Sequence, residues 1–251
     1  MGRTGQRHLP FDEHFFDRER KTPEQLKELW YFLGASCVSY ALHLPNRRGS
    51  HCNVWASPRR ELIETIKRCL KSDHTLSYRD DGRHREWKLQ IVSESLAVRL
   101  STEYGLGQNR MEHEIPEDLP TTYLDHFVRG LYDGGGKCAV YARTPGKRSI
   151  HEHVSLRIQL SEALRNELYG ILLRRANIPP GINVYNDSPR HLNFTGGAIH
   201  RIADYMYRDW GCIESHGLYV PDKLDDIVSH AGFPRPGKTA TPPIAASASR
   251  A

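Results

Sequence analysis

Hydrophobic residues recur along the chain with two periods, that of an amphipathic helix and that of a strand with one buried face. After Thr22, apolar residues follow helical spacing to about residue 37. Thr22, Pro23 and Gln25 form a strong helix start, because they supply an N-cap, a proline at the first helical position and a capping box. Residues 38–44 then alternate between apolar and polar, which predicts a strand.

The same order of elements occurs twice. In the first half we expect helices near 22–37, 57–70 and 93–104, and strand pairs at 38–44 with 51–56 and around 76–78 with 87–91. In the second half we expect helices near 121–133, 161–176 and from 197 onward, and strand pairs at 137–143 with 152–160 and 182–185 with 191–194. Each half therefore reads α-β-β-α-β-β-α, which predicts an α+β fold built from duplicated halves.

This repeat divides the chain into five segments. The two halves occupy residues 22–106 and 121–220, and the polar stretch 107–120, which contains Pro116 and Pro120, reads as a linker. Residues 1–21 are an N-terminal extension. The segment 221–251 is rich in Pro, Ala, Ser and Thr, so we expect it to be mostly disordered apart from a short helix near 224–228.

Composition excludes several classes of protein. The 251 residues are 38% hydrophobic, which is enough for packed cores, but no apolar run is long enough for a membrane span. The first residues lack the apolar region of a signal peptide, so we expect an intracellular protein, cytoplasmic or nucleoid-associated, with no membrane partner. The five cysteines are scattered without a Cys-x-x-Cys pair, which argues against a disulfide framework or a zinc site.

The positions of the basic residues indicate a polyanionic binding partner more clearly than the net charge of +5 does. Basic turns at Arg47/Arg48 and Lys147/Arg148 lie in equivalent hairpins, where they would hold phosphates, although a single such turn is equally compatible with a solvated loop. Arg, Lys, Asn and Gln are the residue types that read base edges in the major groove. The candidate DNA-binding residues in turns and on outward strand faces are Arg47, Arg48, Asn53, Arg79, Lys88, Gln90, Arg143, Lys147, Arg148, His151, His153, Arg157, Asn183, His191 and Asn193.

Two glycines, Gly34 and Gly130, lie 96 positions apart near the ends of the first helix of each half. Each of these helices leads into a strand hairpin. Small residues at such positions let two helix backbones pack closely. We therefore expect Gly34 and Gly130 to face each other at a seam between two pseudo-symmetric halves.

The stretch from Tyr123 to Gly134, with its His-Phe-Val-Arg-Gly-Leu-Tyr-Asp-Gly run, resembles the second motif of single-chain LAGLIDADG homing endonucleases. The resemblance covers roughly residues 11–220. It implies a monomeric saddle that binds double-stranded DNA, associated with an intron or an intein. It also implies metal-assisted phosphodiester hydrolysis, in which one acidic residue from each motif helix holds a divalent cation such as Mg²⁺.

The chain departs from this family pattern at both acidic positions. The eighth motif position is Ser39 in the first half and Gly135 in the second, and neither residue supplies a carboxylate. Asp133, at the sixth position of the second motif, is the nearest acid, and it binds metal only if the helix end is reshaped. We therefore expect a DNA-binding protein whose nuclease centre is weakened or lost.

Other interpretations compete with this one. The glycines at 134–136 are a helix stop and not a phosphate loop, because they follow a helix and Lys137 is followed by Cys138. The pair His151 and His153 suggests a metal site or, as we favour, a polar surface facing DNA. A non-nuclease descendant, acting as an RNA-splicing maturase on intron RNA or as a transcriptional regulator, is the main alternative. A small-molecule enzyme on an unrelated fold would need a triad or a metal cluster, and the sequence has neither.

Overall fold

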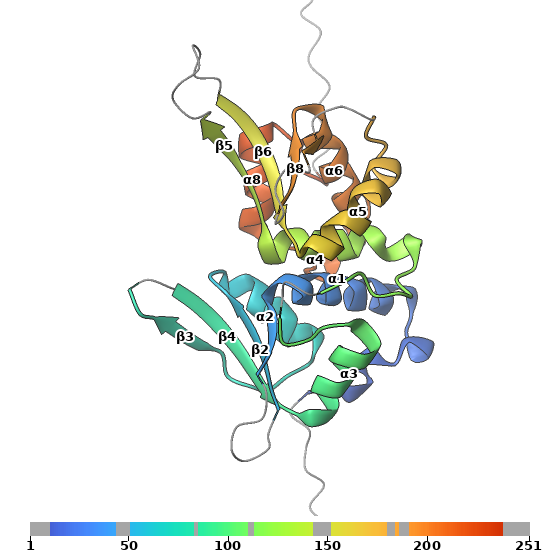
Figure 1. Cartoon of the computed structure of the whole chain (residues 1–251), viewed down its shortest axis with the longest axis vertical. Coiled ribbons are helices and arrows are strands. Elements are labelled where there is room, and N and C mark those ends of the chain that lie inside the picture. The colour runs from blue at the N-terminus through green and yellow to red at the C-terminus, as the bar shows by residue number, and fades with distance from the viewer. Residues whose placement is uncertain are drawn as a thin grey trace, which may run out of the picture.

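The computed structural model in Figure 1 has two halves, one on each side of a central pair of helices. The structure describes residues 11–43, 51–82, 85–109, 113–142, 152–179, 184–185 and 191–237. In the part of the chain that is described, no helix combines the length and the apolar character that a membrane span requires.

The first half contains a four-stranded antiparallel sheet and three helices in the predicted order. The strands pair in the order β1-β2-β4-β3. The element bounds are α1 Pro23–Ser39, β1 Tyr40–His43, β2 Cys52–Ser57, α2 Arg60–Cys69, β3 Ser77–Asp80, β4 Arg85–Val92 and α3 Glu94–Tyr104.

The second half repeats this arrangement with strand order β5-β6-β8-β7. Its elements are η4 Thr121–Tyr123, α4 Leu124–Gly135, β5 Gly136–Ala142, β6 Glu152–Gln159, α5 Glu162–Arg175, β7 Val184–Tyr185, β8 His191–Thr195 and α6 Gly197–Tyr207. The expected α-β-β-α-β-β-α order is therefore confirmed in both halves, with helix and strand bounds that differ from the prediction by a few residues.

Local signals fix the helix ends as the sequence indicates. Thr22 and Gln25 form the capping box of α1, in which the Gln25 side chain accepts from the Thr22 amide at 2.9 Å and the Thr22 hydroxyl accepts from the Gln25 amide at 3.4 Å. Ser93 caps the start of α3, and Gly105 ends it in the left-handed conformation at φ +64°.

The segments outside the two repeats are also folded onto them. Phe11, Phe15 and Phe16, which precede the first repeat, are buried in the core. At the other end, α7 Trp210–Ser215 and α8 Pro221–Ala231 follow α6, and Leu224 and Ile227 of α8 are buried. The prediction of a mostly disordered tail from residue 221 is therefore wrong as far as residue 237.

The reason for this error is visible in the local sequence. Pro221 occupies the first turn of α8, and Gly232 follows it at φ +67°, so the helix has ordinary start and stop signals. The Ala-, Ser- and Pro-rich composition comes mainly from residues 238–251, which lie outside the described residues.

Candidate nucleic-acid interface

The seam between the halves is formed by the direct packing of α1 against α4. A Cβ atom built on Gly34 would collide with the carbonyl oxygen of Phe127, and one built on Gly130 would collide with that of Tyr31. Both distances would be below 3.0 Å, which real Cβ atoms essentially never show. Tyr31 and Phe127 are themselves 96 positions apart, like the two glycines. The contact is therefore the same in both directions, and the predicted pseudo-twofold seam with Gly34 and Gly130 is confirmed.

The C-terminal ends of α1 and α4 contain the two positions at which the family resemblance places acids. Ser39 is 2% exposed, and its hydroxyl donates to the carbonyl oxygen of Ala35 at 2.7 Å, within its own helix. Gly135 has no side chain, and a Cβ built there would lie 3.3 Å from Cβ of Val38. No carboxylate is therefore present at either position.

Asp133 is a core residue and does not point toward the end of the seam. It is 1% exposed, and one of its carboxylate oxygens accepts from the Tyr31 hydroxyl at 2.9 Å and from the Val220 amide at 3.1 Å. These contacts fix it between α1 and the segment before α8. The suggestion that Asp133 holds a metal is therefore wrong, because burial and both hydrogen bonds turn its oxygens away from solvent.

Burial raises the pKa of Asp133 to about 7, although hydrogen bonds from Tyr31 and the charges of Arg129 and Lys223 oppose the shift. An acid with a raised pKa binds more protons in the folded chain than in the unfolded chain. Its contribution to stability is therefore complete below its ordinary pKa near 3.8 and is lost as pH rises toward about 7.

Asp133→Asn should remove this pH dependence, because asparagine keeps an acceptor for Tyr31 and Val220 but does not ionise. We expect the free energy of unfolding of the variant, relative to the wild type, to increase between pH 4 and pH 7 by at most about 1.4 kcal/mol per pH unit. Urea denaturation at several pH values measures this difference. Parallel pH profiles for the two proteins would mean that Asp133 titrates normally.

Arg129, which the motif contains between His126 and Gly130, has a structural role. It is fully buried, and its guanidinium donates to the carbonyl oxygens of Leu218 at 2.7 Å and Met206 at 2.8 Å, and it lies 2.8 Å from Nδ1 of His126. Burial and the neighbouring cations lower the pKa of His126 to about 2, so this imidazole is a neutral acceptor. Arg129 therefore fixes the end of α6 and the segment before α8 against the seam.

The outward face of the first sheet is less cationic than the sequence indicates. Lys88 pairs with Glu86 at 2.7 Å, and Arg79 pairs with Asp81 at 2.8 Å. Gln90 is exposed on the same face, as expected. The positive charges of this sheet are therefore largely balanced by neighbouring carboxylates.

Asn53 does not belong to this face, and its assignment to DNA binding is wrong. It is fully buried and pairs across the sheet with Ile91, which is also buried. Its amide accepts from the Tyr40 hydroxyl at 2.8 Å and donates to the carbonyl oxygens of Ile91 and Ser93 at 3.1 and 2.9 Å. The strand alternation that turns Trp55 inward also turns Asn53 inward, and three hydrogen bonds offset the cost of burying it.

The outward face of the second sheet brings several of the predicted residues together. Lys137, Arg157 and Asn193 are neighbours across β5, β6 and β8, because Arg157 is in register with both of the others. His153 and His191 lie on the same face, while the alternate positions, such as Leu156 and Leu192, are buried. Arg47, Arg48, Arg143, Lys147, Arg148, His151 and Asn183 lie outside the described residues.

Lys137 and Tyr141 are members of this face that reasoning from the sequence missed. A signal for them exists, because Cys138 is buried at 1% exposure and β5 alternates around it, so Lys137, Ala139 and Tyr141 point the other way. The signal is weak, because the small and apolar residues of this strand do not alternate clearly with polar ones.

The donor set at the seam does not fit a divalent cation. Hard cations such as Mg²⁺ take oxygen ligands, chiefly from carboxylates. Among the described residues, no group of three or more His, Cys, Asp or Glu side chains is arranged to hold a metal ion. With Ser39 bonded to its own helix and Asp133 in the core, the C-terminal ends of α1 and α4 have no exposed carboxylate to offer.

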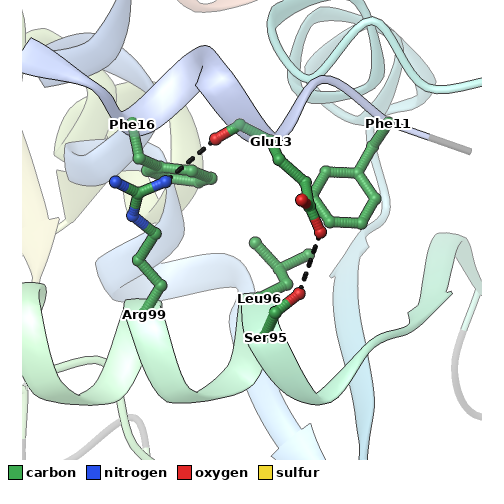
Figure 2. Close-up of a pocket in the computed structure, with 6 residues that line it drawn as sticks. All are labelled: Phe11, Glu13, Phe16, Ser95, Leu96 and Arg99. Carbon is green, nitrogen blue, oxygen red and sulfur yellow. Dashed lines mark hydrogen bonds between the residues drawn. The ribbon is translucent and has the colours of Figure 1, made fainter. Parts of the chain in front are cut away.

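A small hollow on the first half, away from the seam, lies where the N-terminal segment meets α3 (Figure 2). Ser95 donates to the Glu13 carboxylate at 3.0 Å, and Arg99 donates to the Glu13 carbonyl oxygen at 2.9 Å and to Asp17 at 2.7 Å. These bonds satisfy the polar groups around the hollow. The hollow is therefore a packing contact between the N-terminal segment and α3, and it does not support the interpretation of the protein as a small-molecule enzyme.

Comparison with known proteins gives structural matches only. No protein-family model matches the sequence, and no curated protein matches it significantly. Similar solved structures include the homing endonuclease I-WcaI bound to its DNA recognition sequence, with 14% identity, a TM-score of 0.48, and coverage of 87% of this chain and 93% of that one. The LAGLIDADG meganuclease I-CpaMI bound to uncleaved DNA has 12% identity, a TM-score of 0.45, and coverage of 80% and 91%. The homing endonuclease I-LtrWI bound to target DNA has 12% identity, a TM-score of 0.44, and coverage of 81% and 96%.

Proposed function

We propose that this protein binds double-stranded DNA as a homing-endonuclease-like saddle and does not cleave it with a two-metal centre of its own. The observation that carries the proposal is the outward face of the second sheet, where Lys137, Arg157 and Asn193 form one row of potential hydrogen-bond donors. Cationic and amide side chains on a strand face are suited to base edges in the major groove. The basic turns at Arg47/Arg48 and Lys147/Arg148 are proposed to hold the phosphates on either side.

The seam supports the proposed loss of cleavage. Two-metal hydrolysis needs carboxylates that hold cations beside the attacking and leaving oxygens. Ser39 keeps its hydroxyl on Ala35, and Gly135 has no side chain, so this chain supplies neither ligand. Binding and cleavage are therefore separable here, and a protein that binds DNA tightly without cutting it is the expected result.

The purified chain should bind duplex DNA but produce no site-specific double-strand cuts in Mg²⁺ or Mn²⁺. The test incubates it with a genomic fragment library and sequences the ends. Recurrent cuts at one sequence would refute the loss of cleavage, whereas failure to bind any duplex at low salt would refute the DNA-binding proposal itself.

Ser39→Asp combined with Gly135→Asp is the restoring variant. It should gain affinity for Mn²⁺ relative to the wild type, measured by isothermal titration calorimetry, because it places one acid at the end of each seam helix. The matched control is Ser101→Asp with Gly170→Asp, which adds the same two charges on α3 and α5, away from the seam. Equal Mn²⁺ binding by the two variants would show that the motif alignment is wrong.

A transcriptional regulator with an added helix-turn-helix is disfavoured by the C-terminal helices. Lys223, Leu224 and Ile227 of α8 are buried, so one face of this helix packs on the core, and its exposed positions include the acids Asp222 and Asp225. Its Asp222 and Asp226 pair with Arg59 at 2.9 and 3.6 Å, and aspartates repel phosphates. The alternative of intron RNA binding is tested by competing duplex DNA against structured RNA, and preferential RNA binding would favour it.

A further inference from the structure

The two sheets differ in how their outward cations are neutralised. In the first sheet, Arg79 and Lys88 pair with Asp81 and Glu86 at 2.8 and 2.7 Å. In the second sheet, neither Lys137 nor Arg157 forms an ion pair with any described residue, and the described outward positions include no acid. A duplex would therefore displace carboxylates to reach the first sheet but meet unpaired donors on the second.

The outward row that starts at the second residue of the first strand in each sheet, β5 or β1, shows the same contrast. In the second half it consists of Lys137, Arg157 and Asn193. The corresponding row in the first half consists of Ala41, Val54 and Gln90. Only Gln90 of that row has a polar side chain, so the first sheet has far less capacity to discriminate bases there.

Arg157 is held in one place by an aromatic ring. The carbon of its guanidinium lies 3.5 Å from the centre of the Tyr141 ring, which is a close cation–π stack. The cross-strand pair of Ala139 and Ser155 lies between the rows of Arg157 and Tyr141, and both side chains are small enough for the arginine to cross them. A guanidinium fixed in this way loses less conformational freedom when it binds a ligand.

Arg157 and its neighbour also carry unmet hydrogen-bonding capacity. Nε of Arg157 and Oδ1 of Asn193 are buried, and neither has a hydrogen-bond partner among the described residues. These residues are directly in register across β6 and β8. Buried polar atoms without partners are unusual in folded proteins, which marks this pair of residues as one that the described part of the chain does not satisfy by itself.

We propose that the second sheet supplies the base-specific contacts of this protein and that Arg157, stacked on Tyr141, reads a guanine in the major groove. Arginine donates bidentately to O6 and N7 of guanine, the commonest specific contact between proteins and DNA. Asn193 lies where its amide contacts the adjacent base pair. Tyr141 is a positioning residue, since it orients the guanidinium and does not itself contact the base. This inference rests on the proposed duplex binding and assigns its specificity to one half.

The test is selection of sequences from a random duplex library by the full chain and its variants. The wild type should enrich a guanine at one position, with a preference of about 5- to 150-fold over other bases. Arg157→Ala should abolish the preference at that position and leave the other positions unchanged. Lys88→Ala and Gln90→Ala, the matched controls on the first sheet, should retain it.

The Tyr141 variants separate positioning from simple loss of structure. Tyr141→Phe keeps the ring and should keep the guanine preference, whereas Tyr141→Leu removes the stack and should weaken the preference by about 2- to 10-fold. Circular dichroism verifies that each variant is folded. The proposal is overturned if Arg157→Ala lowers affinity evenly for all sequences, because Arg157 would then be a phosphate contact. It is overturned together with the proposed function if the wild type binds no duplex.

Discussion

Gly130→Ala should destabilise the protein by about 3 kcal/mol or more, even though it adds only one methyl group. The new Cβ would collide with the carbonyl oxygen of Tyr31 and lie 2.7 Å from the amide nitrogen of Ala35. Both are backbone atoms of α1, so neither can rotate away. The two helices would have to separate, and the packing along the whole seam would weaken.

Helix propensity opposes this effect but is too small to reverse it. Alanine is favoured over glycine within a helix by about 1 kcal/mol. Gly170→Ala on α5 is the matched control, because its Cβ would meet only the end of the Arg174 side chain at 3.5 Å. That variant should be neutral or up to about 1 kcal/mol more stable. Urea denaturation compares the two, and equal stability of Gly130→Ala and the wild type would contradict so close a seam.

The sequence repeat that produces the seam is the reason why much of the fold is predictable from the sequence. The repeated order of elements follows from helical and strand periodicities that occur twice, and Gly34 and Gly130 stand out because each lies at the same place near the end of the first helix of its repeat. Both features are local or spaced by a fixed interval, so a single sequence contains them. The pairing of the strands then follows from the short connections in each hairpin.

The site was less predictable because its residues depend on long-range neighbours. Asn53 looks like a DNA-reading residue until Tyr40, Ile91 and Ser93 supply the three hydrogen bonds that bury it. Asp133 resembles a spare metal ligand until Val220, 87 positions away, donates to it. Polarity in a strand or at a helix end indicates a need for partners, and only the fold shows whether those partners are protein or ligand.

The stacking of Arg157 on Tyr141 is also invisible in the sequence. The two residues are on different strands, and their contact depends on the register of β5 with β6 and on the small pair Ala139 and Ser155 between them. Register is fixed by packing on the opposite face, where Cys138, Leu156 and Phe194 are buried. The core of the second half therefore determines where its candidate base-reading side chain lies.

Duplex binding should depend steeply on salt. About 6–10 phosphate contacts would lower the affinity by roughly 10³- to 10⁵-fold between about 50 and 200 mM salt, because each contact releases a condensed counterion. The hairpins β1–β2 and β5–β6 are equivalent in the two halves, and their turns carry Arg47, Arg48, Lys147 and Arg148. These four residues are the predicted phosphate contacts.

Changing these four residues to alanine should weaken binding to every sequence and make the salt dependence shallower, by about 0.9 in the logarithmic slope for each phosphate that is no longer neutralised.

The matched control is Arg174→Ala with Arg175→Ala, compared with Lys147→Ala with Arg148→Ala. Both pairs remove two positive charges, but Arg174 and Arg175 are exposed at the end of α5 and not on a strand face. The turn pair should reduce the slope by about 2 and the helix pair should leave it nearly unchanged, as measured by fluorescence anisotropy on random duplexes at several salt concentrations. Binding that does not vary with salt, or equal effects of the two pairs, would mean that the basic turns are ordinary solvated loops.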